Sequence, residues 1–315
     1  MVKFCIIDSY SAESEKVLAP HIYIAKLICE IYGGVFFLAT TEDLNKYMNY
    51  PFDKIFYCYG SYYHDYKNVS KFFSLHPHAK AYWITNEYNL ILDKPVQEAL
   101  QSHKYSIISN FEEKAKSVKY MKWDKWHMVN LNALKMFEPN PMTKKEYPVC
   151  YYGTFRVDRQ RYFMEYMKKG MILSTSLKNL KKYRDIGCNP TYFNKFFWGR
   201  RRETLNLFKY SLYIEDETHH EKKLYNHPAN RYYEALYCNV VQFFDDNCRH
   251  TFERYGLDIP DFYWVGGFGE LMERVTEADK DWETHHKLQL GWVDKALKDK
   301  QEAIKQFGDI INEGV

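Results

Sequence analysis

Two short segments in the second half of the chain carry residue types that bind phosphate and sugar hydroxyl groups. The first, GTFRVDRQR, starts at Gly153 directly after the apolar run YPVCYY. A small residue lets backbone N–H groups approach a phosphate, and guanidinium groups neutralise its charge. The candidate phosphate-binding residues of this segment are Gly153, Thr154, Arg156, Arg159 and Arg161. An ordinary strand-to-helix turn is the alternative interpretation.

The second segment, NRYYEAL at 230–236, places Arg231 and Glu234 three residues apart, just before the apolar run NVVQFF. On a helix this spacing puts both side chains on one face. A guanidinium and a carboxylate there could hold a diphosphate and a ribose diol together. The alternative is an exposed ion pair on a helix surface, which would contribute only about 0.2–0.5 kcal/mol.

The elements that must position these residues follow an alternating pattern. Short apolar runs alternate with amphipathic segments, which is typical of parallel sheets with crossover helices. We expect strands at 2–7, 35–40, 55–59, 81–85 and 105–109, then at 147–152, 171–175, 211–215, 239–244 and 262–265. A helix is expected over 21–34, ended by Gly33 and Gly34, and beyond 268 the pattern is purely helical.

The proline-rich segment 137–148 is predicted to link two doubly wound α/β domains. We therefore expect an N-terminal domain at 1–140, a second domain at 141–280 and C-terminal helices at 281–315.

Composition excludes several protein classes. The chain has 315 residues and a formal net charge of +3, too small to prove a polyanionic partner. Its seven cysteines lack paired spacing, so we expect neither a zinc site nor a disulfide framework, and no other metal site is predicted. No run approaches the eighteen apolar residues of a membrane span. We expect a soluble, cytoplasmic monomer with no membrane partner and no tightly bound cofactor.

Positive charge gathers in one part of the second half. From Arg156 to Arg202 there are thirteen Lys or Arg against three Asp or Glu, and aromatic residues lie among them. The run Arg200, Arg201 and Arg202 is the densest part. Clustered cations with aromatic neighbours are typical of a surface that contacts a nucleic-acid backbone, although an ordinary basic surface has the same composition.

The whole chain resembles the T-even phage DNA β-glucosyltransferase family, inverting GT-B enzymes that move glucose from UDP-glucose to 5-hydroxymethylcytosine in duplex DNA. That family carries a Gly-Ser-Phe-Arg-x-x-Gln-Arg loop, matched here by GTFRVDRQR with one extra residue before the Gln-Arg pair. Either Arg159 or Arg161 can therefore fill the second arginine position. The family also has an Arg-x-x-Glu pair before an apolar strand, matched by Arg231 and Glu234, and a tail that FYWVGGFGELMERV resembles.

The resemblance implies a GT-B fold, two Rossmann-like domains facing a central cleft, and a UDP-sugar donor, with a divalent cation as an additional requirement left open. It implies backbone groups for the uracil at Ile214 and a general base after the strand ending at Thr85. A carboxylate at the end of a strand points into a cleft from rigid backbone. Glu87 is the best match, although a gap-free alignment would place Asn86 there. The competing residues are Asp43, Asp53, Asp65, Glu98 and His21.

Three functions are thus predicted in order of preference. The first is an inverting glycosyltransferase that moves a sugar from a UDP-sugar to a 5-hydroxymethylpyrimidine in double-stranded phage DNA, acting in the host cell cytoplasm. The second is a GT-B transferase acting on a glycan, since FKYSLYIED and NRYYEALYCNVVQF also resemble fucosyltransferase-like enzymes. The third is a non-catalytic DNA-binding protein on a transferase scaffold.

Overall fold

The computed structural model describes residues 2–7, 20–33, 37–38, 41–58, 66–85, 97, 101, 103–111, 122–196, 203–215 and 225–313. The chain forms two compact units. The first comprises Met1–Leu134 with Gln301–Val315, and the second comprises Lys135–Lys300.

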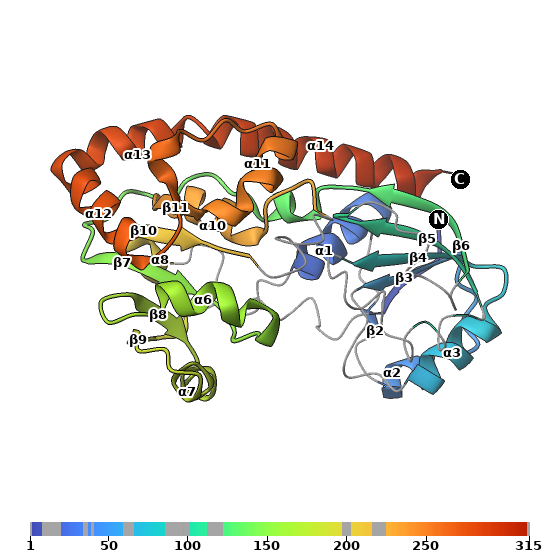
Figure 1. Cartoon of the computed structure of the whole chain (residues 1–315). Helices are drawn as coiled ribbons and strands as arrows, with labels where there is room; N and C mark the ends of the chain where they lie inside the picture. The colour runs from blue at the N-terminus through green and yellow to red at the C-terminus, as the bar shows by residue number, and fades with distance from the viewer. Residues whose placement is uncertain are drawn as a thin grey trace. The chain divides into compact units, whose positions relative to one another are not determined.

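A six-stranded parallel sheet in the order β2-β1-β3-β4-β5-β6 forms the centre of the first unit (Figure 1). Strands β1, β3, β4 and β5 are buried almost throughout, because helices cover both faces of a parallel sheet, and they therefore appear in the sequence as continuous apolar runs. The elements of this unit are β1 (Phe4–Ile7), α1 (Pro20–Tyr32), β2 (Phe37–Leu38), α2 (Thr41–Lys46), β3 (Lys54–Cys58), α3 (Tyr66–Leu75), β4 (Lys80–Thr85), β5 (Lys104–Ser109), β6 (Lys122–Met128) and most of the 3-10 turn Leu131–Lys135.

Consecutive residues of β3 show which helix covers which face. Phe56 packs against Tyr32 of α1, with ring centroids 6.0 Å apart. The next residue, Tyr57, meets Phe73 of α3 at 6.3 Å. Because consecutive strand side chains point to opposite faces, α1 and α3 lie on opposite sides of the sheet. The predicted helix end is confirmed, since Gly33 adopts φ +72°.

The last turn of α14 (Val293–Asn312) is fastened to the first unit. The Ile311 carbonyl accepts hydrogen bonds from Tyr32 Oη at 2.6 Å and Tyr82 Oη at 3.2 Å, and also from Lys54 Nζ. The Lys80 ammonium reaches the Glu313 carbonyl at 2.6 Å. Hydroxyl and ammonium donors satisfy carbonyl groups that a helix end leaves without partners. The predicted segment 281–315 is thus shared, with 281–300 in the second unit and 301–315 in the first.

The second unit contains a second parallel sheet, ordered β12-β11-β10-β7-β8-β9. The chain runs outward from β7 to β8 and β9, then returns to place β10 on the other side of β7. Its elements are β7 (Tyr147–Tyr152), a 3-10 turn (Val157–Arg159), α6 (Gln160–Tyr166), β8 (Ile172–Thr175), α7 (Leu177–Asp185), β9 (Thr191–Asn194), α8 (Glu203–Asn206), β10 (Phe208–Tyr213), α10 (Asn230–Tyr237), β11 (Val241–Asp245), α11 (Arg249–Tyr255), β12 (Trp264–Val265), α12 (Phe268–Ala278), α13 (Trp282–Leu290) and the start of α14.

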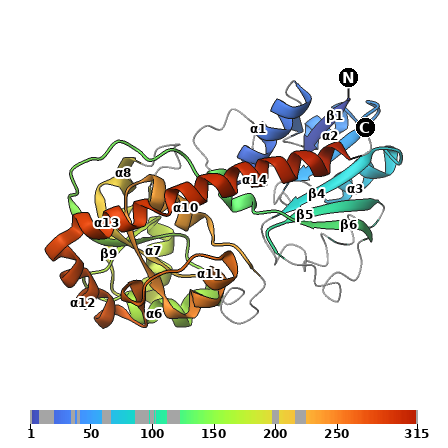
Figure 2. The ribbon, with the colours of Figure 1, turned by 90° about the horizontal axis from the view of Figure 1, so that it is seen from above.

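This strand order reverses direction between β7 and β10, which makes their carboxyl ends the topological switch point of the unit. Right-handed crossovers that run in opposite directions place their helices on opposite faces. Figures 1 and 2 agree, with α6 and α7 on one side of this sheet and α10 and α11 on the other. The predicted doubly wound arrangement of both halves is confirmed.

The sequence missed two strands and displaced two others. Strands β6 and β9 lie at sheet edges and are half exposed, so neither has an apolar run. The predicted strand 239–244 begins at Val241, because Asn239 adopts φ +56° in the turn after α10. The predicted strand 211–215 spans Phe208–Tyr213 instead. Ile214 and Glu215 therefore follow the strand.

The predicted linker contains no helix or strand until β7 begins at Tyr147, but it is bound to the second unit. Asn140 N donates to the Tyr237 carbonyl at 2.7 Å, and Lys145 Nζ donates to the Asn239 carbonyl at 2.7 Å. Burial lowers the pKa of Lys145 to about 8. These contacts place the boundary between the units at 134/135 rather than at 140/141.

None of the described helices combines the length and apolar character that crossing a bilayer requires. All seven cysteines are free.

Two histidines in the second unit are held neutral. The His286 ring stacks on Trp282, with centroids 4.7 Å apart and an angle of 9° between the planes. The His227 ring meets Tyr255 edge-on at 6.3 Å. Burial lowers the pKa of each histidine to about 4.

We expect acidification to destabilise the second unit through these histidines. Their folded pKa lies below the unfolded value of about 6.5, so between about pH 6.5 and pH 4 the unfolded chain binds more protons. The free energy of unfolding, measured by urea denaturation, should fall as the pH drops through this window. A variant carrying His227→Gln and His286→Gln should show a shallower fall. The exposed His78→Gln is the control, and equal slopes in all three proteins would contradict the prediction.

Candidate functional site

Arg231, in the first turn of α10, joins the carboxyl ends of the two strands at the switch point. Its Nε donates to the Tyr152 carbonyl at the end of β7, at 3.2 Å. Its Nη1 donates to the Ile214 carbonyl just beyond β10, at 3.3 Å, and to Glu215 Oε1 at 3.1 Å. The guanidinium lies over the Tyr151 ring, 5.2 Å from its centroid. Burial acts to lower the pKa of Arg231, but Tyr151 and Glu215 raise it, and the net direction is upward.

The second edge of the same guanidinium faces Gly153. A Cβ placed on Gly153 would lie 3.2 Å from Arg231 Nη2 and 2.7 Å from Tyr151 Oη. Among the described residues, Nη2 makes no hydrogen bond, and 15% of the Arg231 side chain is exposed. A guanidinium carries five N–H donors, and this edge holds two of them. The glycine therefore leaves room for an acceptor to approach Nη2.

Arg159 is buried next to Tyr151 and Glu215, the two residues that also contact the Arg231 guanidinium. Its Nη1 donates to Tyr151 Oη at 2.9 Å, and its Nη2 lies 3.9 Å from Glu215 Oε2. The side chains of Arg159 and Glu215 are only 7% and 2% exposed. The sequence left Arg159 and Arg161 as alternatives for this position. The structure brings Arg159 to the switch point, whereas Arg161 is exposed and donates to Tyr162 Oη at 2.7 Å.

The other residues of the first segment line the same loop. Thr154 is exposed, and the half-buried Arg156 immediately precedes the 3-10 turn that leads into α6. Thr175 Oγ1, at the end of β8, donates to the Gly153 carbonyl at 2.8 Å. The Phe155 ring packs edge-on against Tyr183 of α7 at 5.0 Å. Contacts with β8 and α7 thus hold the loop after β7 in place.

Glu234 is oriented differently from the sequence expectation. Although it lies one helical turn after Arg231, its carboxylate accepts from Lys135 Nζ at 3.2 Å, and the two side chains are 3% and 2% exposed. The interpretation of Arg231 and Glu234 as an exposed ion pair is therefore wrong. Each residue has its own buried partner, Glu215 for Arg231 and Lys135 for Glu234. Binding of a ribose by Glu234 stays a prediction.

The sequence missed Glu215 and Lys135. Glu215 was expected inside a strand, where its side chain would have had no reason to meet Arg231. Lys135 lies 99 residues before Glu234, and no spacing connects them. One sequence signal could have identified Glu215. It follows an apolar run, and a carboxylate at the carboxyl end of a strand faces the ligand-binding edge of a parallel sheet.

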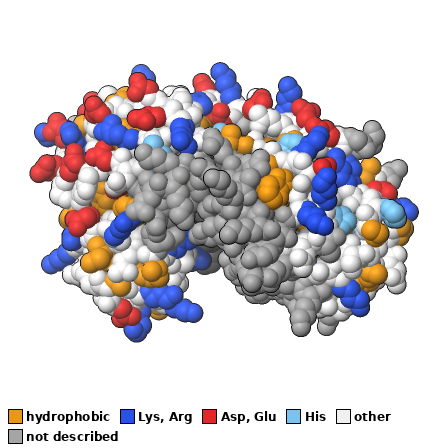
Figure 3. Space-filling view, turned by 45° about the vertical axis from the view of Figure 1, so that its right-hand side comes forward, with side chains coloured by type: hydrophobic (Ala, Val, Ile, Leu, Met, Phe, Trp, Pro, Cys, Tyr) orange, Lys and Arg blue, Asp and Glu red, His pale blue; other side chains and the backbone are white. Residues whose placement is uncertain are grey.

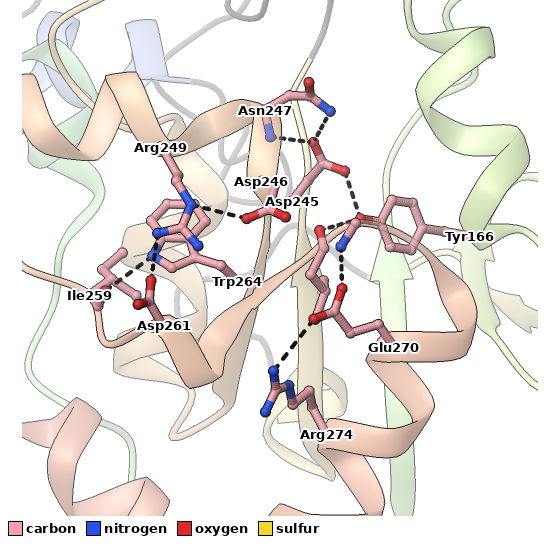
Figure 4. Close-up of polar contacts among 12 residues, drawn as sticks. Tyr166, Asp245, Asp246, Asn247, Arg249, Ile259, Asp261, Trp264, Glu270 and Arg274 are labelled. Carbon is pink, nitrogen blue, oxygen red and sulfur yellow. Dashed lines mark hydrogen bonds and ion pairs between the residues drawn. The ribbon is translucent and has the colours of Figure 1, made fainter.

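The neighbouring strand ends, by contrast, carry a group of polar residues that bind one another (Figure 4). Asp245 Oδ2 lies 2.6 Å from the Tyr166 hydroxyl of α6, whose pKa is raised by burial and then by Asp245. Asp245 Oδ1 accepts from Asn247 N at 3.0 Å. Arg249 binds Asp246 and Asp261 at 3.0 and 2.8 Å, and Glu270 accepts from Gly266 N at 2.9 Å. These contacts fasten α6, α11 and α12 to the ends of β11 and β12.

Several predicted residues lie outside the described part of the chain. These are Glu87 and Asn86, the run Arg200, Arg201 and Arg202, and two competing carboxylates, Asp65 and Glu98. The strand before Glu87 is confirmed, since β4 ends at Thr85. Asp53 precedes β3 and accepts from Lys3 N at 2.7 Å, so it lies at the amino end of the sheet rather than the carboxyl end. Within the described ranges, no three His, Cys, Asp or Glu gather to hold a metal ion.

Comparison with known proteins identifies the fold. No family model and no curated protein sequence matches the chain. The structure of T4 phage BGT in complex with its UDP-glucose substrate is 17% identical, covers 99% of this chain and 100% of its own, and has a TM-score of 0.72. The chain has the GT-B fold. Its predicted resemblance to the T4 enzyme is thereby confirmed at the level of the fold.

More distant structures share this fold. Anabaena HepE in complex with UDP-glucose is 8% identical with a TM-score of 0.56, and sucrose-phosphate synthase from Thermosynechococcus elongatus is 10% identical with a TM-score of 0.59. In both comparisons 99% of each chain is covered. A second T4 phage BGT structure, 16% identical with a TM-score of 0.69 and with 99% of this chain and 100% of that chain covered, contains UDP and Mn²⁺.

We expect Gly153→Ala to block the approach to Arg231. The new methyl group would meet the fully buried Tyr151 hydroxyl at 2.7 Å, and this hydroxyl cannot move without breaking its bond to Arg159. With UDP, the nucleotide of the T4 structures, as the test compound for a diphosphate at this space, calorimetric affinity should fall at least about tenfold, the cost of one lost charge-assisted contact. Gly269→Ala is the control, because no atom lies within 4 Å of its added Cβ. Unchanged affinity in Gly153→Ala would contradict the site.

Proposed function

We propose that the protein is an inverting glycosyltransferase that takes its sugar from a UDP-sugar and passes it to a 5-hydroxymethylpyrimidine in double-stranded DNA. The observation that carries the donor half is the guanidinium of Arg231 at the switch point, with its Nη2 edge beside Gly153. Ligands of doubly wound sheets bind at this place. The T4 and Anabaena structures of the same fold hold UDP-glucose.

In this proposal the arginines bind the diphosphate, with Arg231 and Arg156 in contact with it and Arg159 holding Tyr151 beneath. The proposal assigns backbone groups of Ile214 to the uracil and the Glu234 carboxylate to the ribose. Guanidinium groups stabilise the negative charge that develops on the departing UDP, and a buried setting strengthens this effect. Such charge stabilisation is what sugar transfer demands of the donor site.

The acceptor half assigns the general base to Glu87, directly beyond β4. An inverting transfer is a single displacement, so the acceptor oxygen attacks the anomeric carbon while the base removes its proton. The hydroxymethyl proton goes to the Glu87 carboxylate, the new glycosidic bond forms, and UDP leaves with the bonding pair. A base within a duplex must first be flipped out.

A basic surface in the second unit supports a nucleic-acid acceptor. Among the described residues from 156 to 196, eight Lys or Arg side chains are exposed, four of them on α7. Figure 3 shows Lys and Arg gathered at the lower end of the left-hand unit, the region of α7 in Figure 1. Helix α7 adjoins the phosphate-binding loop through Tyr183 and Phe155. A β-glucosyltransferase structure of the same fold, 16% identical with a TM-score of 0.71, is that of a DNA modifying enzyme. The exposed cations are Arg161, Lys168, Lys169, Lys178, Lys181, Lys182, Arg184 and Lys195.

A divalent cation has a limited place in this proposal. The Mn²⁺ of the T4 structure accompanies UDP. Divalent ions that arrive with a diphosphate need few protein ligands, which agrees with the lack of a clustered carboxylate or histidine site among the described residues. We assign it no step.

A glycan-modifying transferase is the second candidate, because FKYSLYIED and NRYYEALYCNVVQF resemble fucosyltransferase-like enzymes. A non-catalytic DNA-binding protein is the third. Turnover of a UDP-sugar excludes the third candidate, and the role of the basic surface separates the first two.

We expect Arg231→Ala to weaken UDP binding at least about tenfold, because a charge-assisted hydrogen bond contributes about 1.5–3 kcal/mol. Isothermal calorimetry measures this directly. The exposed Arg254→Ala, on α11 of the same unit, is the control. Equal UDP affinity in the Arg231 variant and in the wild type would refute the donor site.

We expect Glu87→Gln to lower sugar transfer by roughly 10²–10⁴ while UDP affinity stays near wild type, because the amide keeps the shape but cannot take the proton. Transfer is measured by incubating hydroxymethylated or plain duplex DNA with a panel of UDP-sugars, digesting the DNA to nucleosides and weighing them. Near-normal turnover would return the search for the base to Asp65 and His21.

We expect charge reversal of Lys178, Lys181 and Lys182 on α7 to reduce transfer to DNA and to make the remaining activity less sensitive to salt, because fewer phosphates are then neutralised. Reversal of Arg200, Arg201 and Arg202 should do the same. The control is reversal of the exposed Lys287 and Lys298 in the same unit. If transfer to DNA survives both sets of changes, the basic region is an ordinary surface and the glycan acceptor is favoured.

A further inference from the structure

Glu215 is a buried carboxylate that the predicted set of binding residues does not include. It follows β10 by two positions, and its side chain is 2% exposed. Its two oxygens face different arginines, Oε1 at 3.1 Å from Arg231 Nη1 and Oε2 at 3.9 Å from Arg159 Nη2.

These contacts close a ring of four side chains. Glu215 binds Arg231 and Arg159, Arg159 donates to the Tyr151 hydroxyl, and the Tyr151 ring lies under Arg231. The remaining contacts of Arg231 are with the carbonyls of Tyr152 and Ile214, which are neutral. Among the described residues, Glu215 is thus the one anionic partner of Arg231.

We propose that Glu215 is a positioning residue for the donor site. Its carboxylate binds Nη1 on one edge of the Arg231 guanidinium, and this fixes Nη2 on the other edge toward the space beside Gly153. The proposal rests on the proposed function, since the group that Nη2 would bind is the diphosphate of a UDP-sugar. Glu215 acts through Arg231 and does not itself contact the donor.

A buried carboxylate beside an anion site can act in two ways, and the two predict opposite changes in UDP affinity when Glu215 is removed. As a counter-charge alone, Glu215 would repel the diphosphate, and its removal would tighten UDP binding. As a positioning residue, its removal would leave Nη1 with its 3.3 Å bond to the Ile214 carbonyl as its remaining partner among the described residues. The guanidinium would then be held less firmly, so UDP would bind more weakly despite the more positive site. The sign of the change therefore distinguishes the two roles.

The experiment compares UDP and uridine on Glu215→Gln, with calorimetry for UDP and NMR titration for uridine. We expect UDP affinity to fall at least about tenfold and uridine affinity to change less than about twofold, because only the diphosphate contact depends on Arg231 orientation. Glu165→Gln, which removes an exposed carboxylate from α6, should match wild type for both ligands. UDP affinity that rises or stays unchanged in Glu215→Gln overturns the proposal, as does an equal loss for UDP and uridine.

A second pair of variants tests the proposal if Glu215→Gln fails to fold. Glu215→Asp keeps the buried charge and should bind UDP with an affinity between those of wild type and Arg231→Lys. In the Arg231→Lys background, Glu215→Asp should have no further effect, because an ammonium has no second edge to orient. An additive loss contradicts positioning through Arg231. Failure of the wild type to bind UDP refutes the proposed function itself, whereas normal UDP binding by the Glu215 variants refutes only this inference.

Discussion

The candidate site rests on the largely buried guanidinium of Arg231. A charge removed from water must be matched by nearby partners, and here they come from the ends of two strands, a carboxylate and an aromatic ring. Because the strand carbonyls are rigid, the guanidinium is held to the sheet rather than to a loop. Its free edge consequently has a fixed direction, which a site for a diphosphate requires.

The doubly wound topology supplies this arrangement. Strands β7 and β10 are neighbours in the sheet although about sixty residues separate them, and the chain leaves them in opposite directions. The loops that follow β7 and β10 therefore lead toward opposite edges of the sheet, which is the arrangement of a ligand-binding switch point. Aromatic packing of Phe155, Phe163 and Tyr183 holds the first of these loops against α6 and α7. The sheet, the loop and the basic surface of α7 thus belong to one packed body.

The strands that could be predicted from the sequence are the buried ones. Strands covered on both faces, such as β3, β4 and β11, are continuous apolar runs and were found from the sequence. Strands β6 and β9 were missed because an edge strand has one neighbour and keeps polar side chains exposed. An error of a few residues in a strand boundary has larger consequences at the site than elsewhere in the fold. The predicted strand 211–215 ends at Tyr213 in the structure, so the sequence did not show that Glu215 follows the strand.

The residue types of the candidate site, and its position in the second half of the chain, could be predicted from the sequence alone. Gly153 and Arg231 were identified because a small residue after a strand lets backbone N–H groups approach a phosphate, and because Arg231 shares a helix face with Glu234 just before an apolar run. The side-chain partners of these residues became visible in the folded chain. Arg159 rather than Arg161 lies at the switch point, Glu215 holds Arg231, and Lys135 holds Glu234. Such pairs form across strands and helices that are distant in the chain, and periodicity carries information only about residues on the same element.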